Sequence, residues 1–141
     1  MPRIIGEGVI NEFILNDPHS GDRIVLYYRF PTAEERINYM SAEFERDGDK
    51  IKMKVGEARQ NFGSKILLGI RKGDLLFKED GKPIRPVCSD PEDPDFIPEW
   101  KALVEVKAAD LIEALAQHAF GIPNFTVGQK IKGEENYNPG N

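Results

Sequence analysis

A long apolar stripe near the C-terminal end limits the folds that this chain can form. The spacing places its members on one face of an α-helix. They recur in steps of four, four, three, four and four: Trp100, Val104, Ala108, Leu111, Leu115 and Ala119. Pro98 suits the first turn of such a helix, and Gly121 with Pro123 beyond it would end the helix. The sequence predicts a helix between Pro98 and Gly121. An interruption near Val106, which would give two shorter helices, stays open.

The N-terminal part of the chain has the pattern of a β-hairpin. Residues 3–15 mix Ile, Val and Phe with polar residues, and residues 23–30 are rich in aromatic and β-branched residues. Between them, residues 16–22 are almost all turn formers. The two apolar segments are therefore predicted to pair as antiparallel strands joined by a long loop.

A helix is predicted to begin directly after this hairpin. Pro31 ends the strand, Thr32 is a good N-cap, and Glu35 is spaced to complete a capping box with it. An apolar stripe follows at steps of four, three and four, and we expect it to face the core. Its members are Ala33, Ile37, Met40 and Phe44. The segment 46–49 would end the helix, with Gly48 as the C-terminal cap.

A second helix is predicted over residues 51–70. Its apolar face would consist of Ile51, Val55, Ala58, Phe62 and Ile66. Gly56 and Gly63 lie on the same side, and each costs roughly 1 kcal/mol relative to alanine in a helix interior. Close approach of a neighbouring element would offset that cost. A functional hinge at Gly63 is the alternative.

Two further segments complete the predicted domain. Residues 75–84 predict a short hairpin with Asp80-Gly81 as its turn, and Pro83 indicates an edge or irregular return strand. Residues 87–100 contain three prolines among acidic residues and predict an extended loop.

The whole pattern predicts an α+β fold. An N-terminal β-hairpin would be followed by about three main α-helices, with a second short hairpin, and helices would dominate. Residues 1–123 would form a single compact domain. Residues 124–141 are polar and rich in Gly and Asn, which is typical of a flexible C-terminal tail.

Composition excludes several classes of protein. The 141 residues carry a net charge of −5, from 24 acidic and 19 basic residues, so the chain lacks the basic footprint of many nucleic-acid-binding proteins. No apolar run approaches membrane-spanning length, and the N-terminus lacks the apolar core of a secretory signal. Cys88 is the single cysteine and cannot form an intramolecular disulfide, which agrees with a reducing compartment. We expect a cytoplasmic protein.

The sequence offers no pattern that favours catalysis. The acidic run over residues 90–95 lacks the glycine and the downstream glutamate of a calcium-binding loop. The glycines form no phosphate-binding loop, and the serines have no neighbouring base in the sequence. We therefore expect a protein that is not an enzyme and needs no cofactor or metal.

A succession of short motifs resembles a family of phage proteins. In chain order the motifs are Tyr28-Arg29-Phe30-Pro31-Thr32 with Glu34-Glu35-Arg36, Gly56-Glu57-Ala58-Arg59 before Lys65-Ile66-Leu67, Gly69-Ile70-Arg71-x-Gly73-Asp74, Ser89-Asp90-Pro91, and Trp100 leading to Ala108-Ala109-Asp110-Leu111-Ile112-Glu113. This arrangement resembles uncharacterised prophage-encoded proteins near the tail genes of Mu-like and other long-tailed phages. It is similar, more loosely, to phage tail assembly chaperones.

The resemblance implies a role in binding other proteins. A tail assembly chaperone binds the tape measure protein and recruits tail tube subunits in the bacterial host cell. A longer frameshifted form exists in many phages, and residues 124–141 would be where such an extension joins. The resemblance carries no catalytic residues to this chain.

Four residues are candidates for a protein interface. A protein that binds a long helical partner needs apolar side chains outside its own core. Leu67, Leu68 and Ile70 lie beyond the main face of the predicted second helix. Trp100, the only tryptophan, is either a core anchor or an interface anchor. Thr32 and Glu35 are assigned a structural role as helix caps.

Two other functions stay open. One is another prophage structural or accessory protein, such as a head–tail completion factor. The other is a small regulatory nucleic-acid-binding domain, which the acidic net charge disfavours. Its support is a group of basic residues in the predicted second helix, namely Lys52, Lys54, Arg59 and Lys65. No membrane partner is expected, and the sequence does not indicate an oligomeric state.

Overall fold

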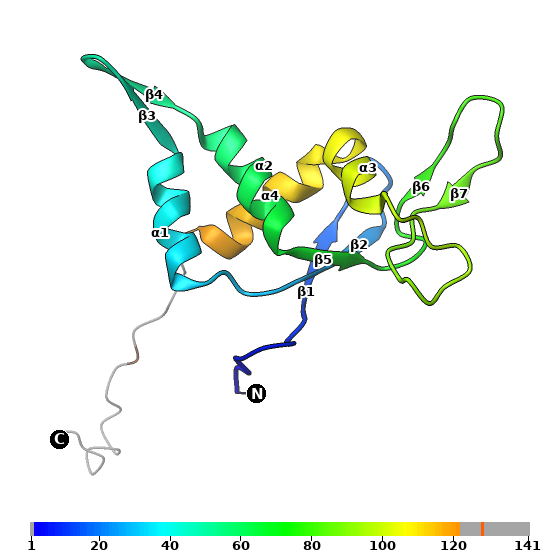
Figure 1. Ribbon diagram of the computed structural model, residues 1–141. Coiled ribbons are helices and arrows are strands. Elements are labelled where there is room, and N and C mark those ends of the chain that lie inside the picture. Colours follow the sequence, from blue (N-terminus) through cyan, green and yellow to red (C-terminus); the bar gives the residue numbers. More distant parts are fainter. Residues whose placement is uncertain (1, 122–127, 129–141) are drawn as a thin grey trace, which may run out of the picture.

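The computed structural model describes residues 2–121 and residue 128. Within them the chain forms four helices and seven strands, in the order β1–β2–α1–β3–β4–α2–β5–β6–β7–α3–α4 (Figure 1). The α+β class is confirmed, with four helices where about three were predicted. The predicted domain boundary at residue 123 and the predicted tail over residues 124–141 lie outside the described residues, apart from Gly128.

A three-stranded antiparallel sheet contains the predicted N-terminal hairpin. Strand β1 (Asn11–Asn16) pairs with β2 (Arg23–Tyr28), and β2 pairs on its other side with β5 (Leu67–Ile70). The loop between β1 and β2 is closed by Asp17, whose carboxylate accepts hydrogen bonds from the backbone N–H groups of His19 and Ser20. The prediction of this hairpin is confirmed, although its first strand begins only at Asn11 and its second strand ends at Tyr28.

Helix α1 begins where the sequence predicts, but it ends earlier. It spans Ala33–Ala42, and both hydrogen bonds of the capping box between Thr32 and Glu35 are present. Gly48 is not a helix cap. Gly48 has a φ of +63° and lies in the two-residue loop between β3 (Phe44–Asp47) and β4 (Lys50–Met53). A glycine at the first position of such a loop suits a hairpin turn, so the segment forms a hairpin.

The predicted bounds of the second helix are wrong at both ends. Helix α2 spans Val55–Ile66. Its predicted first residues form β4, and its predicted last residues form β5. Leu67 and Ile70 are buried in the core, and β5 bonds to β2, so tertiary pairing takes residues 67–70 out of the helix. Helical spacing alone could not reveal this pairing partner.

The apolar stripe at the C-terminal end forms two helices. Helix α3 covers Trp100–Lys107 and α4 covers Ala109–Phe120. The break falls at Ala108, whose φ of −138° and ψ of 44° are not helical. The alternative of an interruption near Val106 is therefore confirmed.

The contact between α2 and α4 lies at the centre of the core. A Cβ atom added to Gly63 would lie 2.7 Å from the carbonyl oxygen of Ile112, whereas one added to Gly56 would meet open space. The close approach of α4 therefore explains the glycine at position 63, but not the glycine at position 56. The core combines residues of the sheet with residues of the helices, and it includes Ile24, Leu26, Tyr28, Ile66, Leu67, Val104, Ile112 and Leu115.

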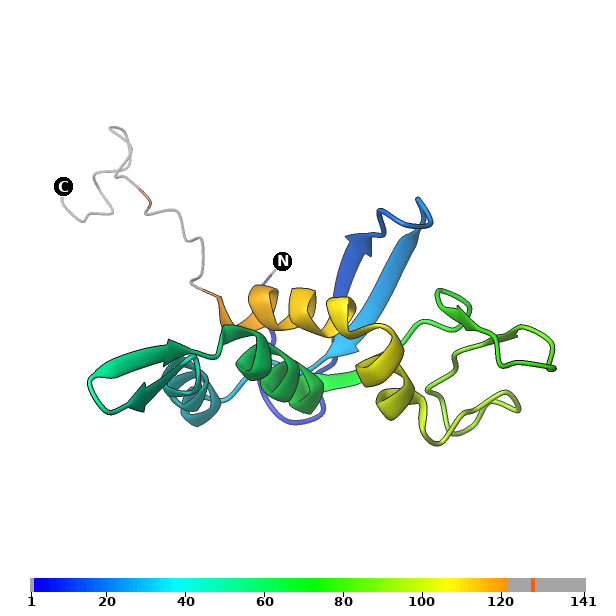
Figure 2. The same ribbon diagram turned by 90° about the horizontal axis from the view of Figure 1, so that it is seen from above.

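Two hairpins project from opposite ends of this core (Figures 1 and 2). The β3–β4 hairpin continues from α1 and α2. At the other end, β6 (Leu76–Phe77) pairs with β7 (Arg85–Pro86). The second hairpin was predicted, but its return strand begins only after Pro83. The segment between β7 and α3 is the expected extended loop.

Candidate protein-interaction surface

One end of the molecule consists of α1 and the β3–β4 hairpin, and we call this unit the arm. Its base is fixed by the capping box. Glu35 Oε1 accepts a hydrogen bond from the Thr32 N–H at 2.9 Å, and the Thr32 hydroxyl accepts one from the Glu35 N–H at 3.1 Å. These bonds fix the start of α1, which is the joint between the arm and the strand β2 that precedes it.

Arg29 strengthens this joint. Its two terminal nitrogens donate to the two carboxylate oxygens of Glu35, at 2.7 and 2.8 Å. These hydrogen bonds, helped by the Thr32 N–H, lower the pKa of the Glu35 carboxyl from 4.5 to about 2 despite its partial burial. The sequence correctly assigned Glu35 to a structural role, but it did not identify Arg29 as its partner.

Helix α1 faces the core with the side opposite to the one predicted. Tyr39 is the buried residue, and its ring stacks on Phe120 with centroids 4.7 Å apart and meets Phe62 edge-on. The predicted core stripe points to solvent instead, since Ile37 and Met40 are each 65% exposed. The prediction that this stripe faces the core is wrong, because the aromatic cluster holds the other face of the helix.

Exposed apolar side chains also lie on the β3–β4 hairpin, and together with Ile37 and Met40 we call them the apolar row. Phe44 opens β3 opposite Met53 of β4, and Ile51 lies two residues before Met53 on the same face of the hairpin. These three side chains are 52–68% exposed. We define the arm surface as Ile37, Met40, Phe44, Ile51 and Met53. The hairpin part of this surface is hollowed beside Phe44, Arg46 and Ile51.

The other face of the hairpin is polar and carries balanced charges. Glu45 lies opposite Lys52, and Asp47 lies opposite Lys50. Lys54 Nζ lies 3.3 Å from a carboxylate oxygen of Glu45, and hydrogen bonding to this group raises the pKa of Lys54. The two faces of the hairpin therefore differ: one carries charges of both signs, and the other carries Phe44, Ile51 and Met53 beside Arg46.

The four residues that the sequence suggested for an interface lie elsewhere. Leu67, Ile70 and Trp100 are buried in the core, so their own side chains offer no surface to a partner. Trp100 takes the core-anchor role that the sequence left open. Leu68 alone is exposed, at 43%. Together with Ile70, it borders a shallow hollow of about 420 Å³ beside β5.

This hollow is lined by polar groups that already have partners. The Ser89 hydroxyl accepts a hydrogen bond from the Ile70 N–H and also bonds to its carbonyl. Lys72 Nζ contacts the carboxylates of Asp93 and Asp95 at 2.9 and 2.7 Å, and hydrogen bonds to these carboxylates raise its pKa. The acidic run singled out in the sequence is thus held by a lysine within the chain.

The single cysteine and the two histidines of the chain lie in different parts of the fold. Cys88 is buried, and His118 stacks on Phe13 with ring centroids 4.6 Å apart. His19 lies in the loop between β1 and β2. Among residues 2–121 and 128, no three His, Cys, Asp or Glu side chains are grouped so that they could hold a metal ion. None of the helices described is both long and apolar enough to cross a membrane.

The sequence did contain a signal for the part of the arm that it missed. The residues Lys50-Ile51-Lys52-Met53 alternate in polarity directly after Gly48-Asp49, which is the pattern of a strand that follows a hairpin turn. The prediction of two helices divided this segment between them. Ile51 was therefore assigned to the core-facing side of the second helix, and Met53 was not assigned to any face.

Comparison with protein-family models, with curated protein sequences and with solved structures finds no match for this chain.

Proposed function

We propose that this protein is a non-enzymatic phage or prophage assembly protein of the tail assembly chaperone type. It acts in the cytoplasm of the bacterial host by binding the tape measure protein and tail tube subunits through the arm surface. The phage assignment rests on the sequence resemblance, and one structural observation supports the binding role. Five large apolar side chains are more than half exposed on one projecting unit.

The free-energy cost of exposing apolar side chains to water explains why this observation favours a protein partner. Burying apolar surface contributes roughly 25 cal/mol per Å², so leaving such side chains in water forgoes a large stabilisation. Single exposed apolar residues are common, but several large ones on one projecting unit favour a contact with another molecule. The row along α1 and the hairpin offers the kind of face on which an amphipathic helix of a partner can lie.

The same region argues against the nucleic-acid alternative. Of the four basic residues that supported it, Lys54 pairs with Glu45 and Glu57, and Lys52 lies opposite Glu45 across the hairpin. Lys65 Nζ lies 4.9 Å from the centre of the Phe62 ring. A nucleic acid would need cations that are free to contact phosphates.

Co-purification tests the proposed function. Full-length protein carrying both Ile37→Ser and Met40→Ser should lose at least tenfold in capture of a tape measure fragment, because apolar contact area is lost. A matched control carries Ile84→Ser and Val106→Ser, which are similarly exposed and lie outside the arm. The control should change capture by less than twofold.

Other outcomes would contradict the proposal at different points. Failure of the unaltered protein to capture tape measure and tail tube proteins at low and moderate salt rules out the chaperone role. If both double variants lose capture equally, the binding site is not on the arm. A gel shift of DNA at low salt, where phosphate contacts are strongest, would favour the nucleic-acid alternative instead.

A further inference from the structure

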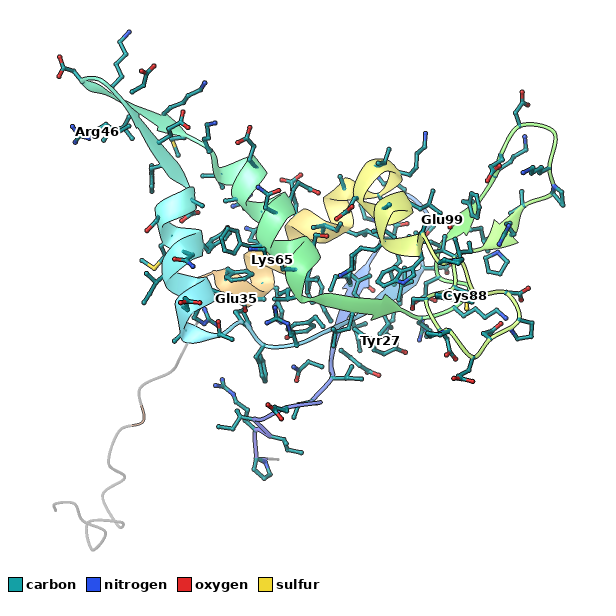
Figure 3. All side chains as sticks on the ribbon, viewed as in Figure 1. Tyr27, Glu35, Arg46, Lys65, Cys88 and Glu99 are labelled. Atoms are coloured by element: carbon teal, nitrogen blue, oxygen red, sulfur yellow. The ribbon has the colours of Figure 1, made fainter. Side chains whose placement is uncertain are left out.

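The arm surface is bordered by opposite charges at its two ends. Glu34 is exposed in the first turn of α1, three residues before Ile37, so it lies at the base of the apolar row. Arg46 is exposed on β3, two residues after Phe44 and on the same face of the hairpin. Figure 3 shows Arg46 on the projecting hairpin and Glu35, the sequence neighbour of Glu34, at the opposite end of α1.

Neither of these charges has an ion-pair partner of its own. Within the described part of the chain, neither Glu34 nor Arg46 takes part in a salt bridge. Two nearby carboxylates differ in this respect. Glu35 is held by Arg29, and Glu45 is held by Lys54. Both charges beside the apolar row are thus available to another molecule.

Along the arm, Glu34 comes first, the apolar row follows, and Arg46 comes last. This order is complementary to a second copy of itself that runs in the opposite direction. If a second copy is turned by 180° and laid along the arm in the opposite direction, Glu34 of each copy meets Arg46 of the other. The apolar rows then face each other between the two ion pairs. A contact of this kind uses the same patch twice and closes on itself, as in most homodimers. The parallel arrangement would instead bring like charges together at both ends.

We infer that the free protein is an antiparallel dimer in which each arm surface is covered by the arm surface of a second copy. The position of the arm favours this contact. It projects from one end of the molecule, away from the β6–β7 hairpin and from α3 (Figures 1 and 2). Two arms can therefore lie against each other without either core being rearranged.

This inference does not depend on the proposed function, but it adds a consequence to it. A tape measure protein that binds the arm surface must displace the second copy, so dimer formation and partner binding compete. The dimer would keep the apolar row covered until a partner is present.

Light scattering of the full-length protein across a range of concentrations tests the inference. The unaltered protein should reach twice the 15.9 kDa of one chain. Either Glu34→Arg or Arg46→Glu should raise the dimer dissociation constant by about tenfold, because each reversal creates two like-charge contacts per dimer. The double variant should restore the dimer. Glu79→Arg, at the other end of the molecule, serves as the control.

A mixture provides a second measurement that avoids the double variant. Equal amounts of the two single variants should form dimers together, because each then meets opposite charge at both ends. Circular dichroism of every variant establishes that it is folded. A monomeric unaltered protein, or a double variant as weakly associated as the single ones, would overturn the inference. Since no partner enters these measurements, their failure is distinct from failure of the co-purification.

Discussion

The α2–α4 contact and the arm use similar apolar side chains, yet only the first is covered. Ile112 on α4 is completely buried, and the backbone beside it lies so close to α2 that only glycine fits at position 63. Ile37 on α1 is 65% exposed. Both helices are amphipathic. The difference teaches that amphipathic spacing defines a face, whereas a neighbouring element decides whether the face is buried.

The orientation of α1 shows how that decision is made. Tyr39 contributes one large ring to a cluster with Phe62 and Phe120. Aromatic pairs contribute about 0.5–1.5 kcal/mol each beyond their buried area. Tyr39 lies on the side of the helix away from Ile37 and Met40, so burying its ring turns both of them to solvent.

Truncation of isoleucine to alanine should affect stability much more at the α2–α4 contact than in the arm. Ile112→Ala should lower the free energy of unfolding by about 2–5 kcal/mol, because it leaves a cavity between α2 and α4. Ile37→Ala removes the same atoms from an exposed site and should change stability by no more than about 0.5 kcal/mol. Urea unfolding of both variants in dilute solution measures the difference. Equal losses would show that the arm is packed in the monomer.

A glycine pair sharpens the comparison within α2 itself. Gly63→Ala should destabilise the protein by about 1–3 kcal/mol, because the added Cβ meets the Ile112 backbone. Gly56→Ala should stabilise it by about 0.4–1 kcal/mol, since its Cβ would meet open space and alanine favours the helix. Thermal unfolding followed by circular dichroism measures both changes. A stabilised Gly63→Ala variant would refute the close packing of α2 on α4.

The smallest expected effect concerns the joint between the core and the arm. Glu35→Gln keeps a side chain that can complete the capping box but removes the ion pair with Arg29. At pH 7 the loss should be about 1 kcal/mol. The pKa of Glu35 is lowered from 4.5 to about 2 in the folded protein, so its ionised carboxylate stabilises the fold above about pH 4.5. This stabilisation is lost as the pH falls toward 2.

Unfolding of Glu35→Gln and the unaltered protein at pH 7, 4 and 2.5 checks this dependence. The difference between the two proteins should shrink steadily as the pH falls. Thr32→Ala offers a comparison at pH 7, with an expected cost of about 1 kcal/mol from the lost cap. A difference between Glu35→Gln and the unaltered protein that is independent of pH would mean that the charge of Glu35 does not stabilise the joint.

Local signals predicted much of the fold because they act over a few residues. Thr32 and Glu35 fix the start of α1 through hydrogen bonds within one turn. The turn formers between residues 16 and 22 fix the first hairpin. The candidate interface was predicted less well. Leu67, Ile70 and Trp100 are apolar, as an interface requires, but the same property placed them in the core.

Where several elements begin and which residues share a face could be predicted from the sequence, because both follow from backbone geometry and short-range bonding. Tertiary structure alone decided which faces are covered. Residues 67–70 became a strand because β2 offered an edge, and Ile37 and Met40 became surface because Tyr39 found two aromatic neighbours on the opposite side. Burial depends on contacts between residues far apart in the chain, and a local pattern does not contain them.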